Sequence, residues 1–256
     1  MALFDLDNTL VDRLGAFRTW AAGFVRSVGG GPDDLAWLLG IDDDGRAPRR
    51  ELFGAVKYRW DLSQSVDDLL SSYRRTQTDF CRPDPAIISP LRLLKEARWW
   101  IAAITNGSAV QHRKVDRAGL VDLVDAVYVS SEVGSVKPDP SIFLAACRGG
   151  SEVTHDGRVV MVGDSPEADI GGAHAFGLTT VWLDRGRSWP NLPFRPDYVA
   201  APWPMPSRSS WRSIRTDPTC RWTRGAGGLL NVDLAVNCLV AGTVDARVPS
   251  PDVGHL

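Results

Sequence analysis

Two aspartates follow the first apolar segment of the chain with a single residue between them. Asp5 and Asp7 come at the end of the segment Ala2–Leu6, which has the character of a buried β-strand. Side chains alternate along an extended chain, so the two carboxylates point to the same side, roughly 7 Å apart along the strand. Such a pair could bind a divalent cation through its oxygens, or divide into a nucleophile and a general acid/base. A D-x-D sequence on its own is more typical of a solvated turn.

Polar residues of the types that bind ions also follow three later apolar segments. Thr105 and Asn106 directly precede an expected helix, where a hydroxyl, an amide and free backbone N–H groups suit a phosphate, although a simple helix cap uses the same residues. Lys137 lies in a proline-bounded loop and is one of four lysines beside 25 arginines, which fits either a fixed point charge or a solvated lysine. Asp164 ends another segment, and Asp169 lies in the first turn of a helix, where capping explains one acid more easily than both.

These residues lie at or after short, mostly apolar segments that do not alternate polar with apolar residues, which is typical of central parallel strands covered on both faces. The expected strands are Ala2–Leu6, Trp99–Ile104, Ala126–Val129, Val159–Val162 and Thr179–Leu183. Helical patterns lie between them, over Pro90–Ala97, Ser108–Ala118, Pro140–Cys147 and Pro166–Phe176. The order predicts an α/β fold with a doubly wound parallel sheet, which gathers the polar strand ends into one crevice.

An insertion over residues 13–85 separates the first two expected strands and has apolar residues at helical spacing. An ordinary crossover needs one helix, so several helices here predict a small second domain inserted into the first. Its Arg and Trp residues, such as Trp20 and Arg59, have the spacing of packed or solvated helix faces rather than of a substrate site.

The last residues differ in kind from the rest of the chain. Residues 201–256 contain six Arg and four Asp but no Lys, Glu, Phe, Tyr or Gln, and no clear periodicity. We therefore expect an atypical, poorly ordered C-terminal tail. A shifted reading frame in a GC-rich gene is one hypothesis for its composition.

Composition excludes several classes of protein. The 256 residues carry a formal net charge of −2, so no overall basic field attracts nucleic acid or anionic lipid. Four scattered cysteines form neither a disulfide framework nor a metal motif. The N-terminus lacks the basic residues of a signal peptide, and no apolar run approaches membrane-spanning length. The expectation is a cytoplasmic protein with no nucleic-acid or membrane partner; the sequence leaves the oligomeric state open.

Four segments together resemble the motifs of the haloacid dehalogenase-like (HAD) hydrolase superfamily, in the family's order and spacing. They are Phe4–Val11 (FDLDNTLV), Thr105-Asn106-Gly107, Lys137-Pro138 and Gly163–Asp169 (GDSPEAD). The resemblance covers residues 1 to about 200 and implies a Rossmann-like core, residues 1–12 and 86–200, with a helical cap over 13–85.

The resemblance also implies roles for the matching residues. Asp5 would be the nucleophile that forms an aspartyl-phosphate, and Asp7 would protonate the leaving oxygen and then activate water. Thr105 and Asn106 would bind the phosphoryl oxygens, and Lys137 would add positive charge.

A magnesium site is implied as well. Asp5, Asp164 and the backbone carbonyl of Asp7 would bind Mg²⁺, with Asp169 supporting it directly or through water. Dehalogenating members of the family lack the second acid, because a halide departs without a proton, so Asp7 favours hydrolysis of a small phosphorylated metabolite. A 2-haloacid dehalogenase, a phosphosugar mutase and a catalytically silent binding protein are the alternatives.

Overall fold

A computed structural model of the protein describes residues 1–150 and 159–200; the segment expected to form a poorly ordered tail, 201–256, lies outside the described residues. Six parallel strands form one sheet in the order β3-β2-β1-β4-β5-β6. The strands are β1 (Ala2–Phe4), β2 (Ile101–Thr105), β3 (Ala126–Val129), β4 (Val160–Gly163), β5 (Thr179–Leu183) and β6 (Tyr198–Ala200). The chain runs outward from β1 to one edge and then to the other, which confirms the predicted doubly wound α/β fold.

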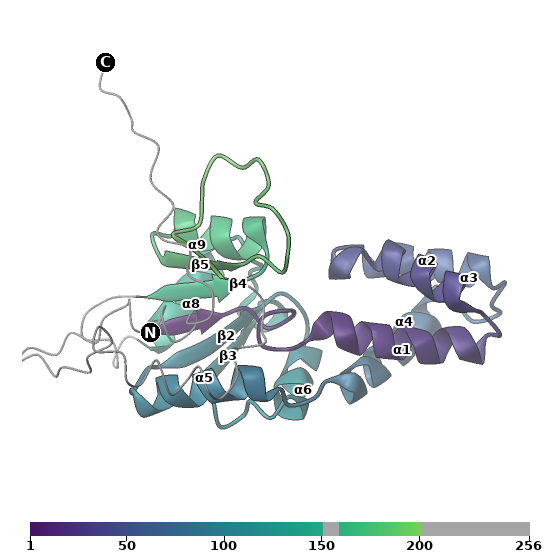
Figure 1. Ribbon diagram of the computed structural model, residues 1–256, viewed down its shortest axis with the longest axis horizontal. Helices are drawn as coiled ribbons and strands as arrows, with labels where there is room; N and C mark the ends of the chain where they lie inside the picture. Colours follow the sequence, from purple (N-terminus) through teal and green to yellow (C-terminus); the bar gives the residue numbers. More distant parts are fainter. Residues whose placement is uncertain (151–158, 201–256) are drawn as a thin grey trace, which may run out of the picture.

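Both faces of the sheet are buried, as the unbroken apolar strands predict. In β1, Phe4 packs into an apolar cluster on one face, whereas Leu3 packs into a second cluster on the other. Helices α5 (Pro85–Glu96) and α6 (Val110–Arg117) contribute to the first cluster; α8 (Pro140–Gly149) and α9 (Gly172–Ala175) contribute to the second. The carboxyl ends of the strands stay uncovered by these helices and point toward the insertion (Figure 1).

Four helices between β1 and α5 pack against one another beside the sheet (Figure 1). We call residues 13–80 the helical insertion; it holds α1 (Arg13–Ser27), α2 (Pro32–Asp42), α3 (Arg49–Arg59), α4 (Val66–Thr76) and two short 3-10 turns, Asp43–Gly45 and Gln77–Phe80. Its core is aromatic: the rings of Trp20 and Tyr73 lie 4.7 Å apart, and Phe17 and Phe53 pack around them. Trp20 is therefore a packing residue, as its spacing indicates.

Some elements differ from the expected ones. The helix expected from Pro90 begins at Pro85, because Asp84 caps its N-terminus by accepting a hydrogen bond from the N–H of Ala86. The helix expected from Pro166 opens with a wider π-type turn, Pro166–Gly171. Strand β6 is not expected from the sequence; it pairs in parallel with β5 at the sheet edge.

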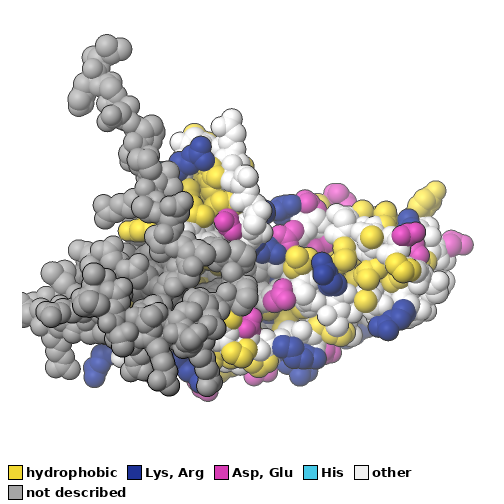
Figure 2. Space-filling model, in the orientation of Figure 1, with side chains coloured by type: hydrophobic (Ala, Val, Ile, Leu, Met, Phe, Trp, Pro, Cys, Tyr) yellow, Lys and Arg dark blue, Asp and Glu magenta, His cyan; other side chains and the backbone are white. Residues whose placement is uncertain are grey.

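The charges on the surface agree with the near-neutral composition. Lys and Arg side chains are intermixed with Asp and Glu over the visible face of the helical insertion (Figure 2). Within the described ranges, every helix is too short or too polar to cross a bilayer.

Candidate active site

Lys137 lies at the centre of the polar strand ends. Its Nζ is 2.6 Å from Oδ1 of Asp5 and 2.7 Å from Oδ1 of Asp169, and it donates to the carbonyl oxygen of Ile104 at 2.7 Å. Burial alone would lower the pKa of this lysine, but the charges of Asp169 and Asp5 raise the pKa above its ordinary value. The ammonium is therefore held in its charged form beside the carboxylate at the end of β1.

Three buried carboxylates converge next to this lysine. Asp5, Asp164 and Asp169 each place one oxygen so that all three lie within 4.8 Å of one another. Burial raises the pKa of Asp5 to about 7 despite the opposing charge of Lys137, and burial together with Asp5 raises the pKa of Asp164 to about 6. The pKa of Asp169 is also raised by burial. Carboxylate oxygens are the donors that Mg²⁺ prefers, and such an excess of buried acid fits a hard divalent cation.

Asp7 lies apart from this group of three and has partners of its own. Lys114 Nζ lies 2.7 Å from Oδ1 and 2.6 Å from Oδ2 of Asp7, and Gln111 Nε2 donates to Oδ2 at 3.0 Å. Burial would raise the pKa of Asp7, but the charge and hydrogen bond of Lys114, with that of Gln111, lower it below the ordinary value. Sequence reasoning missed both partners. The scarcity of lysine that singled out Lys137 applies equally to Lys114.

The residues after β2 connect the other parts of the site. Thr105 Oγ1 lies 2.5 Å from Nε2 of Gln111. The side chain of Asn106 makes two hydrogen bonds to the backbone of Lys137: it accepts from the N–H at 2.8 Å and donates to the carbonyl oxygen at 3.0 Å. In this structure the Asn106 amide therefore holds the lysine loop, and its contact with a phosphoryl group stays a prediction.

A second cation pair that sequence reasoning missed faces Asp164. Its Oδ2 lies 3.0 Å from Nη1 of Arg185 and 3.3 Å from Nη2 of Arg187, both just beyond β5. Arg185 also pairs with Asp44 of the helical insertion. Asp164 and these arginines lie more than 20 residues apart in the sequence, so no local motif predicts the contact.

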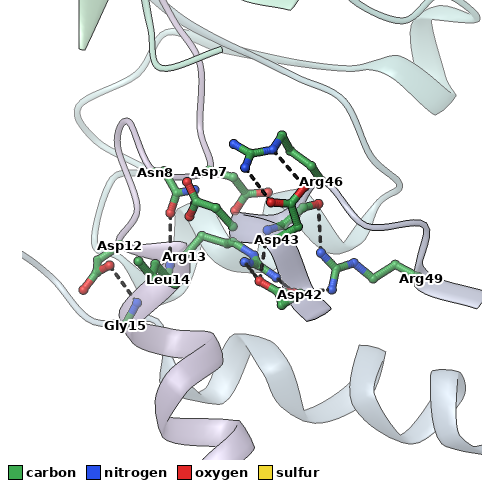
Figure 3. Close-up of polar contacts among 12 residues, drawn as sticks. Asp7, Asn8, Asp12, Arg13, Leu14, Gly15, Asp42, Asp43, Arg46 and Arg49 are labelled. Atoms are coloured by element: carbon green, nitrogen blue, oxygen red, sulfur yellow. Dashed lines mark hydrogen bonds and ion pairs between the residues drawn. The ribbon is translucent and has the colours of Figure 1, made fainter. Parts of the chain in front are cut away.

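Three successive aspartates of the insertion, Asp42, Asp43 and Asp44, each form an ion pair with arginine. Figure 3 shows the pairs made by Asp42 and Asp43. Asp42 is fully buried and binds two arginines: Arg13 through Nη2 at 2.6 Å and Arg49 through Nη1 at 2.6 Å. Burial would raise the pKa of Asp42, but the hydrogen bonds and charges of Arg13 and Arg49 lower it. The sequence of Asp42–Gly45 predicts only a turn, but its ion pairs fix the end of α2 next to the site.

A cavity of about 760 Å³ lies between the carboxyl ends of the strands and the helical insertion. Every candidate site residue predicted from the sequence lines it: Asp5, Asp7, Thr105, Asn106, Lys137, Asp164 and Asp169. Tyr73, Arg74 and Gln77 line it from the insertion. A buried carboxylate, a second acid and a nearby lysine give this cavity the types of group that nucleophilic displacement at an electrophilic centre requires.

The comparisons with known proteins agree with this geometry. The family model for haloacid dehalogenase-like hydrolases matches residues 2–183, which include every one of these site residues. The chain belongs to the haloacid dehalogenase-like hydrolases. This confirms the family that the four motifs resemble.

Relatives within the HAD-like hydrolases include both phosphatases and dehalogenases. The pyrimidine 5'-nucleotidase YjjG of Escherichia coli is 34% identical over 57% of this chain and 62% of its own length. The (S)-2-haloacid dehalogenase 1 of a Pseudomonas species is 28% identical over 72% of this chain and 83% of its own. A solved HAD phosphatase from Thermococcus onnurineus aligns with a TM-score of 0.52 and 27% identity, over 77% of this chain and 91% of that one. The chain spans less than two thirds of the length of the nucleotidase.

Proposed function

We propose that this HAD-like hydrolase is a Mg²⁺-dependent phosphatase that hydrolyses a small phosphorylated metabolite through an aspartyl-phosphate on Asp5. The observation that carries the proposal is the position of Asp7, a second carboxylate in the same cavity as Asp5. An alkoxide leaving group needs a proton and a halide does not, so a second acid beside the nucleophile supports phosphate chemistry.

In the first step a carboxylate oxygen of Asp5 attacks phosphorus. The new O–P bond forms as the ester P–O bond breaks, and Asp7 supplies a proton to the departing oxygen. Lys137, 2.6 Å from Asp5, places its positive charge where the negative charge of the phosphoryl group gathers. Thr105 lines the cavity at the end of β2, where its hydroxyl can donate to a phosphoryl oxygen.

In the second step water attacks the phosphorus of the aspartyl-phosphate. The bond between Asp5 and phosphorus breaks, inorganic phosphate leaves, and Asp7 accepts a proton from the attacking water. The lowered pKa of Asp7 favours the ionised carboxylate that this second step needs, whereas the first step needs Asp7 protonated. The proton that Asp7 accepts from water is the one it donates to the leaving oxygen in the next turnover.

The residues that would hold Mg²⁺ are Asp5, Asp164 and the backbone carbonyl of Asp7, with Asp169 in support. The three converging buried carboxylates support this assignment, because their negative charges need a cation when substrate phosphate is added. When bound, Mg²⁺ neutralises charge on the phosphoryl group.

We propose further that residues 13–85 act as a cap over a core formed by 1–12 and 86–200. The separate aromatic core of the helical insertion supports this division, and so does the cavity between the insertion and the strand ends. A cap of this kind excludes water and contacts the leaving group.

Hydrolysis of 4-nitrophenyl phosphate with and without Mg²⁺ tests the proposal. We expect metal-dependent release of nitrophenol, loss of turnover in Asp5→Asn, and no halide release from 2-chloropropionate. A dehalogenase is the second candidate, supported by the Pseudomonas relative; metal-independent halide release would select it. Asp67→Asn is a matched control, because it neutralises an exposed aspartate of the insertion outside the cavity.

A further inference from the structure

Lys114 is a buried cation that the proposed reaction leaves without a role. Its side chain is 8% exposed, and its Nζ contacts both oxygens of Asp7 at 2.6 and 2.7 Å. Lysine is almost never fully buried unless it is paired. Asp7 is its partner in the part of the chain that the structure describes, so the two charges depend on each other.

Gln111 extends this contact toward the phosphoryl site. Gln111 and Lys114 are three residues apart on α6, so they share one face of the helix. The Nε2 of Gln111 lies 3.0 Å from Oδ2 of Asp7 and 2.5 Å from Oγ1 of Thr105. The helix that follows β2 therefore links the hydroxyl proposed to contact the phosphoryl group with the acid proposed to serve the leaving oxygen.

The two lysines of the cavity serve different carboxylates. Lys137 contacts Asp5 and Asp169, whereas Lys114 contacts Asp7. The Asp7 side chain is 30% exposed and lines the cavity, and three hydrogen bonds from Lys114 and Gln111 fix its carboxylate. Fixing the orientation of a proton donor in this way lowers the entropic cost of reaching the reactive geometry.

We propose that Lys114 and Gln111 are positioning residues that hold the carboxylate of Asp7 in the direction its proton transfers require. The inference rests on the proposed function, because it assigns Asp7 the leaving-group proton. It predicts a specific dependence on the leaving group. A phenolate needs protonation far more than a dinitrophenolate, which departs as a stable anion.

The test compares phenyl phosphate with 2,4-dinitrophenyl phosphate in Lys114→Met, Gln111→Leu and the parent. We expect Lys114→Met to lower kcat/KM for phenyl phosphate at least about tenfold more than for dinitrophenyl phosphate, since general acid–base catalysis contributes about 10²–10⁴-fold. Gln111→Leu, which removes one of the three hydrogen bonds, shows the same preference to a smaller degree. In an Asp7→Asn background, Lys114→Met adds little further loss for either substrate.

Lys95→Met is the matched control, because Lys95 pairs with Asp125 at 2.5 Å outside the cavity. It should leave the ratio of the two substrates unchanged. Equal losses on both substrates in Lys114→Met and Gln111→Leu overturn the inference while leaving the phosphatase proposal intact. A parent protein that hydrolyses neither ester overturns the proposed function instead. If Lys114→Met does not fold, as judged by circular dichroism, Gln111→Leu decides the question.

Discussion

Arg185 and Asp44 form a two-point ion pair between the sheet and the helical insertion. Nη1 of Arg185 lies 2.5 Å from Oδ2 of Asp44, and Nη2 lies 3.1 Å from Oδ1. The same Nη1 lies 3.0 Å from Oδ2 of Asp164, one of the three converging carboxylates. One guanidinium therefore connects the position of the insertion with the charge at the candidate metal site.

Replacing Arg185 should tighten Mg²⁺ binding. In Arg185→Met the carboxylate of Asp164 loses a competing cation, so we expect the dissociation constant for Mg²⁺, measured by isothermal titration calorimetry at pH 8, to fall several-fold. The same change removes the ion pair to Asp44 and should expose the insertion to limited proteolysis. Arg50→Met, which breaks an exposed pair with Asp67, is the control. Weaker Mg²⁺ binding in Arg185→Met would contradict this reasoning.

Replacing Asp164 should abolish the thermal stabilisation by Mg²⁺. A ligand present at a hundred times its dissociation constant stabilises the folded state by about 2.7 kcal/mol. In Asp164→Asn we expect that increment to vanish, because one of the three converging carboxylates is lost. The apo variant should melt no lower than the parent near pH 8, since a buried charge has been removed. Differential scanning fluorimetry across a magnesium series measures both effects, and an undiminished increment would count against the site.

The buried pair between Asp42 and Arg13 predicts a pH dependence of stability. The pKa of Asp42 is lower in the folded protein than in the unfolded chain, where it is about 3.9. Its contribution is therefore complete above about pH 4 and is lost as pH falls through the folded-state pKa. Asp42→Asn leaves Arg13 buried without its counter-charge, so we expect a cost of about 3–5 kcal/mol at pH 7.

Urea unfolding at several pH values measures this cost. The difference between the parent and Asp42→Asn should shrink below about pH 4. Asp67→Asn is the matched control, because Asp67 pairs with an arginine but its side chain is 70% exposed. A constant difference across the whole pH range would mean that ionisation of Asp42 is not the cause.

Two glycine-to-alanine changes should have different effects: Gly163→Ala should weaken Mg²⁺ binding, whereas Gly54→Ala should stabilise the protein. A Cβ at Gly163 would lie 2.3 Å from Oδ2 of Asp169, so Gly163→Ala must displace a carboxylate that Lys137 contacts. We expect Mg²⁺ affinity to fall at least about tenfold, a free-energy change of about 1.4 kcal/mol.

A Cβ at Gly54, inside α3, meets no atom within 4 Å. Gly54→Ala should stabilise the protein by up to about 1 kcal/mol. Magnesium titrations test Gly163→Ala, and melting temperatures test Gly54→Ala. Unchanged Mg²⁺ affinity in Gly163→Ala, or a lower melting temperature in Gly54→Ala, would contradict the packing argument.

The sheet could be predicted because its strands are mostly apolar and do not alternate polar with apolar residues. Residues 126–129 and 179–183 are strands with the predicted bounds, and each has a polar residue or glycine at its start or end. Strand β6 could not be predicted, since three residues in a proline-rich segment carry no periodicity and pair only because β5 offers an edge.

The candidate site could be predicted where its residues end strands, because parallel topology brings strand ends together. Asp5, Thr105 and Asp164 lie at strand ends in this way, whereas Lys137 lies in the loop that follows β3 and a short helix, Ser130–Val133. Lys114 and Arg185 could not be predicted in this way, because a charged residue on a helix or beyond a strand is usually exposed to solvent. Only tertiary packing places each of them against an aspartate.

Asn8 gives the insertion a mechanical connection to the reacting groups. It follows Asp7 in a left-handed conformation, with φ of 65°; its side chain accepts from the N–H of Leu14 in α1 and donates to Asp44 at 3.3 Å. A change in the position of the insertion would therefore shift the backbone next to Asp7 through the contacts of Asn8. A substrate that contacts the insertion would thus also affect the position of Asp7, the proposed acid.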